Sequence, residues 1–107
     1  MHEFIIDTLA KQDLPYYFIK RPHGVYPCVV FNYNESQLAN GDNAEELTLY
    51  DCYFDVICKG NVTENTKKVK KALEDALFQK VVVNGPVMFD GDDFYQITMN
   101  YVRHFKN

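Results

Sequence analysis

The most constraining feature of this sequence is a run of thirteen residues, 47–59, in which side-chain character alternates with a period of two. One face carries Thr48, Tyr50, Cys52, Phe54, Val56 and Cys58, and the other carries Leu47, Leu49, Asp51, Tyr53, Asp55, Ile57 and Lys59. This pattern predicts a β-strand with one buried face and one mixed face. At ~3.3 Å per residue the strand spans roughly 43 Å, well beyond a typical strand. It therefore has to bend or to project past the body of the domain.

Two segments show helical spacing instead. Residues 62–78 have an apolar stripe of Val62, Val69, Ala72, Leu73, Ala76 and Leu77, which predicts an amphipathic helix. Its opposite face holds Lys67, Lys68, Lys70 and Lys71, a charge run typical of a solvated helix face. A shorter helix is predicted over residues 3–11. It ends before Leu14-Pro15, because the residue before a proline avoids helical dihedrals.

The remaining segments read as strands over residues 16–20, 26–34, 81–83 and 94–105. Strand 26–34 is apolar on both faces, which predicts an interior position covered above and below. Residues 87–89 continue strand 81–83 through a bulge at Asn84-Gly85-Pro86. Asp90-Gly91 predicts a hairpin turn into the last strand.

The predicted element order is α-β-β-β-α-β-β. An amphipathic helix has to cover an apolar sheet face, so we expect an α+β fold with a mostly antiparallel sheet and both helices packed on one face. The length of 107 residues suits one domain, 1–107, and no repeat or linker divides it. Hydrophobic residues make up 47% and charged residues 24%, which argues against a disordered chain.

Charge and hydropathy exclude several partners. The net charge of −4 leaves no basic surface for phosphates, so no sequence-specific nucleic-acid partner is expected. No stretch reaches the ~18 apolar residues of a membrane span, and the N-terminus lacks the pattern of a signal peptide. Cys28, Cys52 and Cys58 fall inside predicted strands, where we expect buried thiols in a reducing compartment. We therefore expect synthesis in the cytoplasm and no membrane contact.

No catalytic or metal constellation is recognisable, so we expect no cofactor and no enzyme. His2, His23 and His104 have no second ligand at regular spacing. The acidic turn at residues 90–93 superficially resembles a calcium loop, but the position that requires glutamate is Tyr101. Asp51 and Asp55 share a strand face ~13 Å apart, too far for joint acid–base work.

A polar stretch over residues 35–46 is predicted to be a loop, longer than the usual ~4–6 residues. Leu38 is its only large apolar residue. An exposed Leu38 would anchor a partner, whereas the alternative is that it folds back on its own domain.

Several segments together resemble a known family. They are Tyr26-Pro27-Cys28-Val29-Val30-Phe31, then Leu49-Tyr50-Asp51-Cys52-Tyr53-Phe54-Asp55-Val56, the helix Val69-Lys70-Lys71-Ala72-Leu73-Glu74-Asp75-Ala76-Leu77, and Phe94-Tyr95-Gln96-Ile97-Thr98-Met99-Asn100-Tyr101. In this order they resemble the tail-completion, or tail-terminator, proteins of long-tailed phages and Gram-positive prophages.

The resemblance implies a structural virion protein. It would form a ring, with six copies as the expected size, cap the tail tube and join it to the head connector. Its partners would be itself, the tail-tube protein and the head–tail connector protein, at the tail–head junction of the virion after assembly in the host cytoplasm. We expect the polar loop, the strand ends and the acidic turn to make these contacts, through Leu38, Asp42, Glu45, Glu46, Tyr53, Asp90, Asp92 and Asp93.

Two alternatives stay open from the sequence. One is another phage neck or head–tail connector protein. The other is a small ligand-binding or regulatory domain of ferredoxin-like architecture, which would need a concave apolar pocket with converging polar groups.

Overall fold

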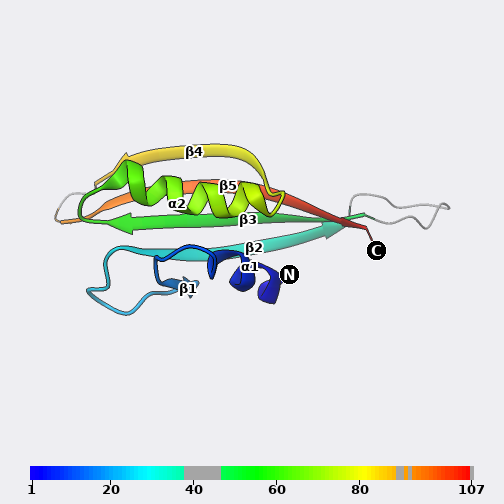
Figure 1. Cartoon of the computed structure of the whole chain (residues 1–107), viewed down its shortest axis with the longest axis horizontal. Coiled ribbons are helices and arrows are strands. Elements are labelled where there is room, and N and C mark those ends of the chain that lie inside the picture. The colour runs from blue at the N-terminus through cyan, green and yellow to red at the C-terminus, as the bar shows by residue number, and fades with distance from the viewer. Residues whose placement is uncertain (38–46, 89–90, 92, 107) are drawn as a thin grey trace.

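The computed structural model describes residues 1–37, 47–88, 91 and 93–106. Its elements are α1 (His2–Leu9), β1 (Tyr16–Phe18), β2 (Cys28–Gln37), β3 (Leu47–Cys58), α2 (Val62–Asp75), β4 (Gln79–Val87) and β5 (Tyr95–Lys106), as drawn in Figure 1. The strands form one sheet in the order β1-β2-β3-β5-β4, in which only β1 and β2 run parallel. The predicted α+β class and element order are confirmed.

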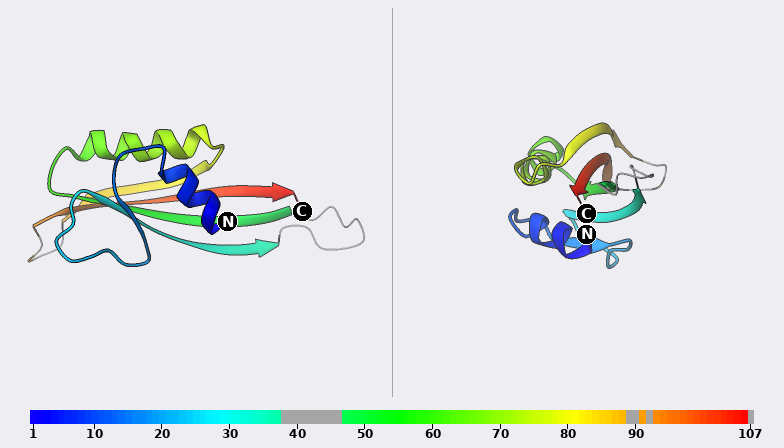
Figure 2. Two further views of the ribbon diagram at one scale, coloured as in Figure 1. Left: turned by 60° about the horizontal axis from the view of Figure 1, so that its bottom comes forward. Right: turned by 90° about the vertical axis from the view of Figure 1, so that its right-hand side faces the viewer.

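Both helices lie on the same face of this sheet (Figure 2). The apolar stripe of α2 places Val69 and Leu73 in the core, where both are fully buried. From α1, Ile5 and Leu9 join the same cluster. They pack on the strand positions that alternation predicted to be buried, which include Phe54 at 0% exposure. Because one face of the sheet takes all the helical cover, we call the other the open face.

The prediction that β2 is covered on both faces is wrong in part. The strand is interior, because β1 and β3 flank it. Val29 and Phe31 point to the helices and are buried, whereas Val30 on the open face is only half-buried. Cys28, on the same open face, is fully buried. The open face of β2 is therefore covered at Cys28 and only in part at Val30.

The strand predicted to be unusually long, β3, projects past the helices. β3 has twelve residues, and the molecule measures 53 × 27 × 22 Å along its principal axes. In Figure 1, β2, β3 and β5 continue past the helices at one end. In the register, β1 stops at Phe18, opposite Phe31, whereas β2 continues to Gln37.

Several element ends differ from the prediction. α1 stops at Leu9 because the Gln12 side chain donates to the carbonyls of Leu9 and Leu14, at 2.8 Å each. α2 stops at Asp75, and Leu77 then takes a left-handed conformation with φ 69°. β1 is two residues shorter than predicted. β2 begins after Pro27 and runs into the predicted polar loop.

Two further predictions, on the cysteines and on the last two strands, are confirmed. Cys28, Cys52 and Cys58 are buried and free. β4 and β5 form an antiparallel hairpin, and β4 has an irregularity between Asn84 and Val87. Neither helix in the described part of the chain is long and apolar enough to cross a membrane.

Candidate functional site

Asp55 is a partly buried carboxylate near the centre of the open face. Asp55 lies opposite Val30 on β2 and opposite Thr98 on β5. Burial raises the pKa of Asp55 above its ordinary value, while hydrogen bonds from the side chains of Thr98 and Gln96 act to lower it. Its polar partners are thus side chains of the adjacent strand.

A surface hollow of about 430 Å³ lies over Asp55, between the open face and the segment after β1. Its lining residues are Ile19, Lys20, Arg21, His23, Val30, Asp55 and Ile57. Arg21 is engaged elsewhere, because its guanidinium lies 4.6 Å from the centroid of the Tyr26 ring. The hollow therefore has one carboxylate already bonded within the sheet and basic groups at its rim. This is not a set of polar groups converging on a ligand.

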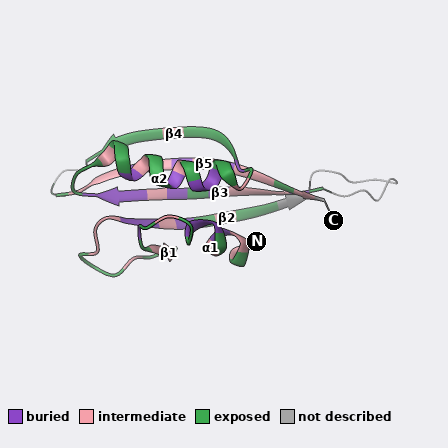
Figure 3. Cartoon of the chain, in the orientation of Figure 1, coloured by how far each residue is buried: buried purple, intermediate pink, exposed green. Residues whose placement is uncertain are grey.

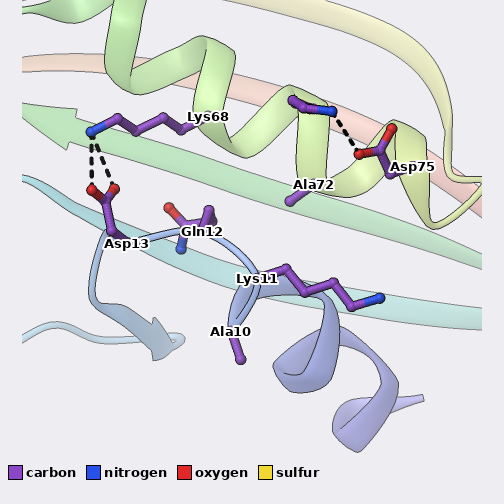
Figure 4. Close-up of a pocket in the computed structure, with 8 residues that line it drawn as sticks. Ala10, Lys11, Gln12, Asp13, Lys68, Ala72 and Asp75 are labelled. Carbon is purple, nitrogen blue, oxygen red and sulfur yellow. Dashed lines mark hydrogen bonds and ion pairs between the residues drawn. The ribbon is translucent and has the colours of Figure 1, made fainter.

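A second hollow, of about 420 Å³, separates α2 from the segment after α1 (Figure 4). Its charges form exposed ion pairs: Lys68 with Asp13 at 3.1 Å, and Lys71 with Asp75 at 3.0 Å. Gln12, which also lines it, is occupied by backbone hydrogen bonds. The Lys68–Asp13 pair joins α2 to the segment after α1, whereas the Lys71–Asp75 pair lies within α2. Exposed pairs of this kind contribute little to stability.

Metal and thiol chemistry find no support among the described residues. No three His, Cys, Asp or Glu side chains come together in the described part of the chain in a way that could hold a metal ion. Burial raises the pKa of Cys52 to about 12 and also raises the pKa of Cys28. A thiol with a raised pKa and no access to solvent is a poor nucleophile.

The outermost strand on one side, β4, is the most unusual surface. Eight of its nine residues are exposed, as Figure 3 shows along its length. Val81, Val82 and Val87 expose 57, 42 and 44% of their surface, and Met88, which follows, exposes 46%. We call these four residues and their backbone the β4 edge. Proteins usually protect such a long apolar edge from pairing with another chain.

The opposite margin of the sheet is stepped. Because β1 has three residues and β2 has ten, β2 is the outermost strand beyond Phe31. We call the stretch from Asn32 to Glu35 the β2 step. Phe18 and Ile19, where β1 ends, expose 42 and 62% of their surface. Apolar groups and a free strand therefore occur at both margins.

Two predicted interface residues lie within the described residues. Tyr53 is 38% exposed on the open face. Asp93 is exposed and pairs with Lys59 at 3.0 Å, and this ammonium lowers the pKa of the Asp93 carboxyl. The structure places Tyr53 on a strand and Asp93 at the hairpin, so it does not bring them into one cluster. The other six lie outside the described residues: Leu38, Asp42, Glu45, Glu46, Asp90 and Asp92.

Sequence reasoning missed both sheet margins. The run Val81-Val82-Val83 has the composition of a core strand, and only the strand order places it at the edge. The polarity of Glu35 predicts a loop at this position. Its pairing with Tyr50, whose hydroxyl donates to the Glu35 carboxylate at 3.0 Å, makes it part of a strand.

Comparison with known proteins gives a structural match without a sequence match. No family model matches the chain, and no curated protein does. Among solved structures, a chain of the "Virion of native gene transfer agent (GTA) particle" is similar, with a TM-score of 0.65 and 13% sequence identity. The alignment covers 96% of this chain and 92% of that chain, so the two share a fold over nearly their whole length.

Proposed function

We propose that this chain is a structural virion protein of a long-tailed phage or phage-like particle. In this proposal it forms a ring that caps the tail tube and joins the tube to the head connector. It is made in the host cytoplasm and resides at the tail–head junction. The proposal rests on one observation: both margins of the sheet are unshielded, in a fold shared with a chain of a gene transfer agent virion.

Two different free margins on one molecule favour a ring over a simple dimer. A contact between unlike surfaces leaves one of each free, so it propagates from copy to copy until a rotation closes it. An exposed apolar strand such as the β4 edge is tolerated when assembly covers it. We expect six copies, the ring size that the tail-terminator resemblance implies.

The internal chemistry supports a non-enzymatic role better than ligand binding or catalysis. The hollow over Asp55 is open to solvent, and its carboxylate is bonded to Thr98 and Gln96 of the same sheet. Burial raises the pKa values of the Cys28 and Cys52 thiols. We therefore propose that the chain acts through its surfaces and needs no cofactor.

The experiment is to measure the mass of the purified full chain by light scattering and to image it by negative-stain electron microscopy. Both are repeated with the tail-tube protein encoded with it. We expect closed rings of about 75 kDa, six times the 12.5 kDa chain, that shorten or stop tube polymerisation. A protein that stays monomeric both alone and with tube protein would overturn the proposal. Rings that bind the connector but leave tube growth unchanged would identify a different neck protein.

A further inference from the structure

Hydrogen bonds to β1 show which residues of β2 direct their backbone groups toward the sheet margin. The Val29 amide donates to the Pro15 carbonyl at 2.8 Å, and the Ile19 amide donates to the Phe31 carbonyl at 2.9 Å. Along a β-strand, the residues direct their backbone groups alternately to one side and the other. Val29 and Phe31 face outward, so Tyr33 and Glu35 also face outward, beyond the end of β1.

The outward groups of the β2 step have no backbone partner among the described residues. The Tyr33 amide is bonded only by the side-chain oxygen of its neighbour Asn32, at 2.8 Å. Glu35 is exposed, and its side chain accepts the Tyr50 hydroxyl. A strand with outward groups bonded this weakly is a template for another extended segment.

We propose that the β4 edge of one copy pairs antiparallel with the β2 step of the next copy. This inference rests on the proposed ring and names the contact that builds it. Within the sheet, β4 runs opposite to β2, because three successive antiparallel pairings separate them. Rotation about a ring axis that makes an acute angle with the strands preserves the sense of the strands along that axis, so β4 meets the neighbour's β2 in the antiparallel sense. The joined sheets continue the pattern of β2, β3, β5 and β4.

The sheet face to which each side chain belongs limits the register of the pairing between β4 and the neighbour's β2. Glu35 lies opposite Tyr50 and Lys80 lies opposite Tyr101, so both belong to the helix-covered face. Placing Lys80 opposite Glu35 pairs an exposed ammonium with an exposed carboxylate. Charge complementarity thus favours a second copy as the occupant.

The β4 irregularities fit the same register. The extra residue between Lys80 and Val82 lets Val83, also on the helix-covered face, lie opposite Tyr33. Further along, Gly85-Pro86 reaches the level of Phe31, where β1 begins to occupy the margin. Pro86 has no amide hydrogen, so no backbone hydrogen bond is given up at the point where β1 ends the pairing.

The register can be tested with Asn34→Cys and Val82→Cys, two exposed open-face positions that lie opposite each other at the joint. They occupy a non-hydrogen-bonded site, where Cα atoms are ~4.5 Å apart, within the range of a disulfide. Under mild oxidation, the double variant is expected to give a ladder of covalent oligomers on a non-reducing gel. Each single variant serves as its control and should stay monomeric on the gel, because the native cysteines are buried.

The outcomes separate this inference from the proposed function. Rings seen by microscopy without a ladder would overturn the strand pairing and leave the ring standing. Dimers from Val82→Cys alone would show β4 pairing with itself and would also overturn it. If a folded protein gave no rings and no ladder, both proposals would be overturned.

A charge swap gives an independent measurement. Lys80→Glu and Glu35→Lys should each raise the dissociation constant of the ring, by about two- to five-fold per joint. The double variant should restore it, because the pair is re-formed with reversed signs. Lys67→Glu, on the exposed face of α2, is the matched control and should leave the ring unchanged. Two additive losses with no rescue would contradict the register.

Discussion

At the scale of single residues, Asp55 on the open face makes the stability of the fold depend on pH. Burial raises its pKa above the ordinary 3.8, so the folded state prefers the protonated carboxyl. The ionised carboxylate therefore lowers the free energy of unfolding at neutral pH. This cost is absent below the ordinary pKa and appears as pH rises through the folded pKa.

We expect Asp55→Asn to raise the thermal midpoint at about pH 7, because the amide carries no charge to desolvate. The gain should shrink as pH falls toward about 4, the ordinary range of an Asp carboxyl, because the raised pKa of Asp55 favours its protonated form there. Thermal unfolding of the variant and the parent at both pH values checks this. Asp51→Asn, on the same strand face, is the control. A loss of stability at pH 7, or an equal gain at both pH values, would contradict the argument.

Gly85 is the second residue whose chemistry is specific. Its φ of 109° is a conformation that L side chains rarely adopt, and a Cβ there would lie 2.8 Å from the Gln96 carbonyl oxygen. Gly85→Ala should lower the free energy of unfolding by about 1–3 kcal/mol. Denaturant titration checks it against Gly60→Ala, where an added Cβ meets nothing within 4 Å. Equal stability of the two variants would show that β4 adjusts freely at its bulge.

At the scale of elements, the contribution of α2 to stability comes from the burial of one apolar stripe and not from the length of the helix. Leu73 is fully buried in that stripe, whereas Leu77, just past the helix, is 71% exposed. Leu73→Ala should cost about 2–5 kcal/mol because it leaves a cavity. Leu77→Ala should change stability by less than about 0.5 kcal/mol. Chemical denaturation measures both, and a comparable loss from Leu77→Ala would mean that this side chain is covered in solution.

The elements also show what the sequence could and could not predict. The alternation that ends at Cys58 predicted β3 to within one residue, because a half-buried strand repeats every two residues. The α2 stripe was readable as far as Ala76, since it repeats at helical spacing, but Leu77, the last residue predicted in it, lies past the helix and is exposed. Strand order was not readable, because Val81-Val82-Val83 would suit an interior strand as well as an edge. The strand character of Glu35 was hidden because it depends on Tyr50, fifteen residues away.

At the scale of the whole molecule, the chain is more extended than its length requires. A compact domain of this size has a radius of gyration of about 13 Å, and this one has 15.1 Å. The excess comes from β2, β3 and β5, which run beyond the helical layer (Figure 1). The projection has little cover of its own, so its surface is available to neighbours. The candidate interface could be predicted from sequence only as strand ends, because the exposed margins depend on the complete sheet.

The short length of β1 has a mechanical consequence for any strand that docks beside it. The end of β1 at Phe18 blocks the margin at the level of Phe31, so an incoming β4 can advance along β2 only until it meets this obstacle. Sliding by one repeat, the usual failure of strand pairing, is thereby stopped in one direction. The displacement of each copy along its neighbour is thereby fixed at one value, and a joint that repeats identically from copy to copy is what a closed assembly requires.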